Sequence, residues 1–213
     1  MLVSHSRDKL INAILYFAEH TRGLGKIKLF KLLYLLDFEH FRQTGRPVTG
    51  MEYRAWKMGP VPAELVQIWD DLDADLAEAI EIRPEKVYDY VRESVVPKRR
   101  FTDTHFTPRE LRILDELAAR YVEDLSEKLI DVTHDENGAW ARVWQDGAGS
   151  DQVIDYRLVL AENDPNREAI LHAAAEYEAI ERASAANVRP PRGGRKLRPP
   201  PATQAYPDDA VRF

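Results

Sequence analysis

The sequence predicts a mainly α-helical single domain around one central apolar helix, with a minor β-sheet and a disordered C-terminal tail. Residues 26–41 are apolar on nearly every helical face and contain no Gly or Pro, helix-period stripes recur on both sides of them, and extended patterns are few. A helix that is apolar all round must be covered on several sides, so residues 26–41 should form the centre of the fold. The segment cannot cross a bilayer, because Lys28, Lys31 and Asp37 interrupt its apolar run.

The composition bounds the class of protein. A chain of 213 residues suits one domain of ordinary size plus an appendage. The sequence has no cysteine, which excludes disulfides, thiolate metal sites and a thiol nucleophile, and which fits a reducing cytosol. The first residues mix charges into an apolar pattern and lack a small-residue cleavage site, so we expect no signal peptide, no membrane association and a cytoplasmic location.

The net charge of −6 is unevenly divided. Residues 183–213 hold six basic and two acidic side chains, so the body is more acidic than the whole chain. An acidic body is a poor nucleic-acid surface, because binding there depends on neutralising phosphates, and only the tail has the required sign. Residues 187–213 are rich in Pro and Arg, which predicts disorder. We therefore divide the chain into a helical domain at 1–165, a helix at 166–186 and a tail at 187–213.

The first half of the domain should begin with two helices joined by a short loop. A buried stripe predicts a helix from Ser6 to about Thr21, and a Gly-containing loop then leads into the central helix. Residues 48–58 alternate as an extended segment. A helix over Pro62–Ile80 follows, with Pro62 at its first position, and its acidic run carries no compensating base. Residues 82–101 read as one or two short strands that pair with 48–58.

The second half opens on the clearest local signal in the chain. Thr107 can cap a helix that has Pro108 at its first position, and Glu110 can complete a capping box, so a helix to Tyr121 or Val122 is predicted. Another helix should begin at Ser126. Two tryptophans four residues apart follow, residues 153–160 are ambiguous between strand and helix, and a final helix covers 166–183.

Motifs for catalysis or cofactor binding are missing from the sequence. It contains no GxxxxGK[ST], no GxGxxG after a strand and no HExxH. The best local metal candidate is His134-Asp135-Glu136, but its spacing matches no ligand set, which favours a solvated loop. Ser126 and His134 lack the context of a hydrolytic nucleophile. We expect no catalytic residue, no cofactor and no bound metal, and hence a protein that is not an enzyme.

Four segments occur together in an order that carries more information than any one of them. They are Lys31–Asp37 (KLLYLLD), Gly45–Gly50 (GRPVTG), Tyr53–Trp56 (YRAW) and Gly59–Pro62 (GPVP). Together with later residues as far as Trp140, they resemble the Panacea domain, also called SocA-like, which was formerly a domain of unknown function found in phage and mobile-element proteins. The resemblance spans roughly residues 7–160.

The resemblance implies a mainly helical antitoxin of a two-gene toxin–antitoxin system, which neutralises a separately encoded toxin by protein–protein contact. It implies no catalytic residues. The candidate family-motif and partner-binding residues are Lys31, Leu33, Tyr34, Asp37, Tyr53, Trp56, Gly59, Pro60, Val61 and Trp140.

The residues themselves leave two questions open. Tyr53 and Trp56, beside the rigid Gly-Pro segment, suit an interface anchor, but Trp56 and Pro60 suit the core equally well. Tyr34 and Asp37 look like a site, although a buried hydrogen-bonded pair ranks slightly higher. Three rival functions also stay open: a nucleic-acid-binding regulator acting through the tail, a metal-dependent hydrolase at His134, and an adaptor that presents its partner to a protease.

Overall fold

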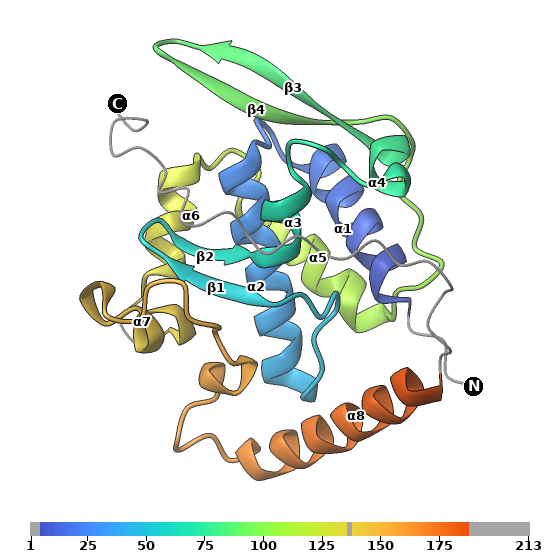
Figure 1. Cartoon of the computed structure of the whole chain (residues 1–213), viewed down its shortest axis with the longest axis vertical. Helices are drawn as coiled ribbons and strands as arrows, with labels where there is room; N and C mark the ends of the chain where they lie inside the picture. Colours follow the sequence, from blue (N-terminus) through green and yellow to red (C-terminus); the bar gives the residue numbers. More distant parts are fainter. Residues whose placement is uncertain (1–4, 136–137, 188–213) are drawn as a thin grey trace.

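The computed structural model describes residues 5–135 and 138–187 and confirms a mainly α-helical fold (Figure 1). Helix α2 (Lys26–Thr44) runs through the middle of the molecule and contacts α1 (Ser6–His20), α5 (Pro108–Arg120) and α6 (Ser126–Thr133). Its apolar side chains are buried on several faces, as the sequence predicts. The helix ends at Gly45, whose φ of 72° is the left-handed conformation that glycine adopts readily. The tail predicted for 187–213 lies outside the described residues from position 188 onward.

The segment after α2 forms a hairpin whose first strand lies within the extended segment predicted for 48–58. Strand β1 (Tyr53–Trp56) pairs antiparallel with β2 (Gly59–Pro62). Proline cannot donate to a sheet ladder, yet it is tolerated in an edge strand, and β2 has a single strand partner here. Pro62 therefore ends the strand, and α3 (Ala63–Ile68) begins one residue later.

The single helix predicted for Pro62–Ile80 is wrong. The structure has two short helices, α3 and α4 (Ala74–Ala79), and the intervening Trp69 is buried with its indole donating to Glu93 Oε1 at 3.1 Å. The acidic run is also compensated from elsewhere in the chain. Arg7 of α1 donates to the carboxylates of Glu64, Asp73 and Asp75 at 2.8 to 3.1 Å.

The strands expected near 82–101 form, but their partners differ from the prediction. Strand β3 (Ile80–Val87) pairs with β4 (Tyr90–Pro97), and the two strands form a hairpin at the top edge in Figure 1. The outer edge of β1 is already bonded by residues 151–154, through Ala55 N to Gln152 O and Ile154 N to Tyr53 O. The region 48–58 therefore offers this segment no free strand edge.

The second half follows its local signals closely. The capping box before α5 is present, with the Thr107 hydroxyl accepting from Glu110 N and the Glu110 carboxylate accepting from Thr107 N. Helix α6 begins at Ser126, and α7 (Ala139–Trp144) carries the two tryptophans. Residues 153–160 combine one β-bridge with a 3₁₀ helix, η2 (Tyr156–Val159).

Helix α8 (Arg167–Asn187) lies along the lower edge in Figure 1 and docks on the end of α2. A second, small apolar cluster joins it to the domain through Phe41, Leu160, Ile170 and Ala174. No helix in the described part of the chain is long and apolar enough to cross a membrane.

Candidate functional site

Contacts join motif residues of α2, the β1–β2 hairpin and α7, and we call the ten candidates the motif cluster: Lys31, Leu33, Tyr34, Asp37, Tyr53, Trp56, Gly59, Pro60, Val61 and Trp140. Leu33 is buried in α2 and takes part in none of the contacts described below. Each of its polar bonds has a definite structural consequence.

Lys31 is buried in the motif cluster, with 1% of its surface exposed. Its ammonium nitrogen donates to the Pro60 carbonyl oxygen at 2.9 Å. Burial lowers the pKa of Lys31 to about 7. Gly59 has a φ of 94°, and a Cβ atom there would lie 2.7 Å from Lys31 Nζ and 3.0 Å from Thr133 Oγ1. A side chain at position 59 would therefore crowd the buried lysine, and the bond from Lys31 to Pro60 fixes β2 against α2.

Asp37, six residues further along α2, is fully buried. Its Oδ1 accepts from the backbone amides of Val48 and Thr49 at 2.8 and 2.7 Å. Its Oδ2 accepts from the hydroxyls of Thr49 and Tyr53, the latter at 3.0 Å. Burial raises the pKa of Asp37, while these donors oppose the rise because they stabilise the charged form. The carboxylate thereby holds the loop after α2 and the start of β1 in position.

The hydrogen-bonded pair of Tyr34 and Asp37 does not form. The Tyr34 ring packs on Phe38, with centroids 4.1 Å apart, and meets the Tyr53 ring edge-on at 5.5 Å. Burial raises the pKa of the Tyr34 hydroxyl. A tyrosine 119 positions away lies close to Asp37 instead: the Tyr156 hydroxyl is 3.4 Å from Asp37 Oδ2.

The tryptophans join α7 to the hairpin. Trp140 is buried, and its indole nitrogen donates to the Trp56 carbonyl at 3.0 Å. Its ring stacks on His134, with centroids 3.8 Å apart and nearly parallel planes, and on Trp144, with centroids 5.5 Å apart. The Trp56 indole donates to Asp151 Oδ1 at 3.0 Å on the exposed side. This arrangement leaves Trp56 partly accessible at the hairpin.

Burial divides the candidate residues into two groups. Trp56 is partly buried, and the other nine members of the motif cluster are buried. The idea that Tyr53 is an exposed aromatic anchor is wrong, because it is 1% exposed and its hydroxyl is bonded to Asp37. The buried residues influence the protein surface indirectly, because their contacts fix the loop after α2 and the β1–β2 hairpin. A role for the cluster in partner binding stays a prediction.

Four further residues complete the bonds and close contacts described above: Thr49, which belongs to the Gly45–Gly50 segment, and Thr133, Asp151 and Tyr156. Tyr156 and Asp151 lie about a hundred residues from the side chains they contact, so no periodicity or short spacing could identify them.

The histidine that the sequence offered as a metal ligand has a different setting. His134 stacks on Trp140, and its Nε2 is buried without a hydrogen-bond partner among the described residues. Burial and the nearby Lys31 charge lower the pKa of His134. Glu136, the third member of that candidate, lies outside the described residues.

Access decides what chemistry the motif cluster can do. Lys31 and Asp37 are 1% and 0% exposed, and both are already bonded within the protein. A substrate cannot reach either group unless the domain opens. The cluster is thus suited to holding a surface rigid.

The comparisons with known proteins agree with the motif. The family model described as "Antitoxin SocA-like, Panacea domain" matches residues 29–141, a segment that includes the whole motif cluster. No curated protein and no solved structure matches the chain. With more than half of its length matched, the chain belongs to the SocA-like antitoxin family and carries a Panacea domain.

Proposed function

We propose that this protein is the antitoxin of a toxin–antitoxin pair and neutralises its toxin by direct protein–protein binding in the cytoplasm, without catalysis. The observation that carries the proposal is the family match over residues 29–141. The toxin is expected from the adjacent gene, in the setting of phage defence or a mobile element. The folded body makes the contact, and residues 188–213 are dispensable for it.

The geometry of the motif cluster supports a binding role. Bonds from Lys31 to Pro60 and from Trp140 to the Trp56 carbonyl hold both strands of the β1–β2 hairpin next to its turn. Rigid aromatic side chains are effective interface anchors, because little conformational entropy is lost when they bind. Trp56 is the aromatic of the cluster that keeps exposed surface, so we assign it as a contact and the buried residues as its support.

The charge of the body supports fast association with a basic partner. Exposed carboxylates gather on α3, on α4 and on the segment between them. Opposite charge raises the rate of encounter more than it adds to affinity. The association rate with a basic toxin should therefore fall as salt increases.

One competing function has an observation of its own. The tail holds five of its six basic side chains within ten residues, from Arg189 to Arg198, which fits nucleic-acid binding by a regulator. An adaptor that hands the toxin to a protease would share the binding step with our proposal, but toxin levels would then fall.

Growth of a host that expresses the adjacent open reading frame tests the proposal. We expect toxicity, and rescue both by the full chain and by a version truncated after Ala186, with toxin levels unchanged on immunoblots. Rescue by the full chain but not by the truncated version would show that the tail is needed to bind the toxin. A harmless neighbour, or toxicity that persists with this protein well expressed, would overturn the proposal.

A further inference from the structure

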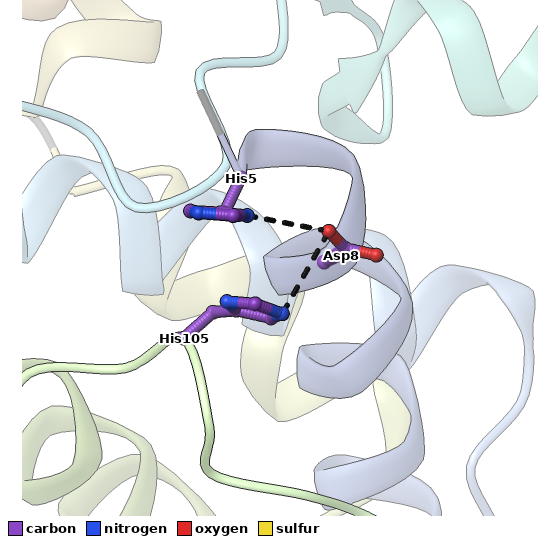
Figure 2. A group of neighbouring side chains, drawn as sticks. All are labelled: His5, Asp8 and His105. Atoms are coloured by element: carbon purple, nitrogen blue, oxygen red, sulfur yellow. Dashed lines mark ion pairs between the residues drawn. The ribbon is translucent and has the colours of Figure 1, made fainter. Parts of the chain in front are cut away.

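Three side chains with metal-binding atoms converge outside the motif cluster. His5 and Asp8 lie at the start of α1, and His105 lies in the loop before α5 (Figure 2). Asp8 Oδ2 is 3.5 Å from His5 Nδ1 and 3.8 Å from His105 Nε2. All three ligand atoms lie within 4.8 Å of one another. Figure 2 shows one nitrogen of each ring turned toward the same carboxylate.

The loop that carries His105 is fastened to α1 by bonds of its own. Asn12 is buried, and its side-chain oxygen accepts from Thr102 N at 3.1 Å. Glu19 accepts from Phe101 N at 3.2 Å, and Lys9 donates to the buried Glu110 at 2.7 Å. These bonds bring a histidine from position 105 beside the first turn of α1. The convergence is therefore set by the fold and does not depend on the contact between the three side chains.

The distances fit ligands around an ion better than direct bonds. A nitrogen–oxygen hydrogen bond is about 2.9 Å long, and both separations exceed this value. Ligand atoms about 2.1 Å from a tetrahedral ion are roughly 3.4 Å apart. Two imidazoles and one carboxylate form a donor set that suits borderline divalent metals such as zinc.

We propose that His5, Asp8 and His105 form a zinc-binding site that joins the start of α1 to the loop before α5. Three protein ligands leave a coordination position open for water or a further ligand, as in zinc sites that are not closed. This site is independent of the proposed antitoxin function. It has no counterpart in the sequence motifs, because His105 is 97 positions from Asp8.

Binding requires a change in the two rings. They are stacked with centroids 4.1 Å apart and an angle of 16° between their planes, whereas an imidazole nitrogen binds a metal in the plane of its ring. The rings must therefore turn apart as the ion enters. The His5 and His105 side chains are 43% and 31% exposed, so this rotation needs no repacking of the core.

Isothermal titration of the tag-free full-length chain with zinc chloride, after dialysis against EDTA, tests the site. We expect one equivalent to bind, and Asp8→Asn and His105→Gln each to weaken binding at least about tenfold. His172→Gln is the matched control, because His172 and Glu176 are an exposed pair 3.8 Å apart for which the described residues provide no third ligand. This variant should bind zinc like the wild type.

Two further readouts separate a specific site from general effects. Zinc should raise the melting temperature of the wild type and not that of His105→Gln, because the ion binds only the folded site. Each variant must melt like the wild type in EDTA. If His105→Gln fails this condition, Asp8→Asn decides. Absence of binding by the wild type, or binding by both variants equal to the wild type, would overturn the proposal.

Discussion

The ammonium group of Lys31 donates to the carbonyl oxygen of Pro60 at 2.9 Å, inside a core where Lys31 is 1% exposed. A family-motif lysine thus reaches a family-motif Gly-Pro segment 29 positions later. The bond explains why the two segments belong together, since an unpaired buried amine would cost the domain stability.

Lys31 should make stability depend on pH in a defined window. Burial lowers its pKa from an ordinary value of 10.5 to about 7, so between these values the unfolded chain holds a proton that the folded chain lacks. Stability should therefore rise with pH from about 7 upward, by at most about 1.4 kcal/mol per pH unit, and level off below pH 7. Lys31→Met should lose this slope. Urea unfolding at pH 7, 8 and 9 measures it, and equal slopes for the two proteins would contradict the assignment.

Gly59→Ala should destabilise the domain by two separate effects. Its φ of 94° strains any side chain, and the added Cβ would lie 2.7 Å from Lys31 Nζ. Gly50→Ala is the matched control, because Gly50 has a φ of 72° but its nearest contact would be Pro47 Cγ at 3.8 Å. We expect a cost of about 1 kcal/mol for Gly50→Ala and at least about 2 kcal/mol for Gly59→Ala in denaturant unfolding. Equal costs would mean that contact with Lys31 adds nothing.

Substitutions of Asp37 should distinguish the loss of its charge from the loss of its hydrogen bonds. Asn keeps an oxygen for the Val48 and Thr49 amides, whereas Ala leaves both amides buried and unpaired. Asp37→Asn should cost about 1–2 kcal/mol in urea unfolding and Asp37→Ala about 3 kcal/mol or more. Asp89→Asn, in the exposed turn between β3 and β4, should stay within about 0.5 kcal/mol. If Asp37→Ala lowers the free energy of unfolding no more than Asp37→Asn does, the hydrogen bonds of Asp37 do not hold the loop.

The attachment of α8 should depend on Gly45. A Cβ atom there would lie 2.5 Å from Ile170 O and 2.8 Å from Ala174 N, and backbone atoms cannot turn aside. Gly45→Ala should therefore displace α8. Hydrogen exchange should show protection lost in α8 and kept in α2, with Gly50→Ala as the control for strain at positive φ. Unchanged protection of α8 would show that the small cluster of Phe41, Leu160, Ile170 and Ala174 adapts.

Local signals explain which elements could be predicted from the sequence. The capping box at Thr107 and the apolar stripe of α1 act between near neighbours, and both helices form where expected. The break between α3 and α4 depends on Trp69 reaching Glu93, and the pairing of β3 with β4 depends on residues 151–154 covering β1. Such contacts join distant segments, so periodicity could not reveal them.

The sequence motif likewise identified some residues of the candidate site but not the contacts they make with distant segments. The motif led to Lys31, Asp37 and Pro60, but it did not show that Asp37 bonds Tyr53 and lies close to Tyr156 in place of Tyr34. It also left open whether Trp56 is core or surface, which depends on Asp151 and Trp140 arriving from later in the chain. Histidines 5 and 105 gave no signal, because only the folded loop brings them to Asp8.

Trp56 should matter more for neutralisation than for folding. Trp56→Ala removes the partly exposed ring, while Tyr88→Ala removes a ring that is 91% exposed on the β3–β4 hairpin, away from the motif. In the growth assay we expect Trp56→Ala to lose rescue and Tyr88→Ala to keep it, with both variants equally soluble and melting within a few degrees of the wild type. If Tyr88→Ala loses rescue and Trp56→Ala keeps it, the toxin contact lies on the β3–β4 hairpin and not at Trp56.

Direct binding between the purified full-length chain and the product of the adjacent gene tests the central claim most closely. Size-exclusion chromatography with light scattering, followed by calorimetric titration, should show a stable complex that forms without nucleic acid, metal or protease and that keeps its affinity when the chain is truncated after Ala186. If a toxic neighbour and this well-folded protein elute separately, with no heat of binding, neutralisation by direct contact is contradicted.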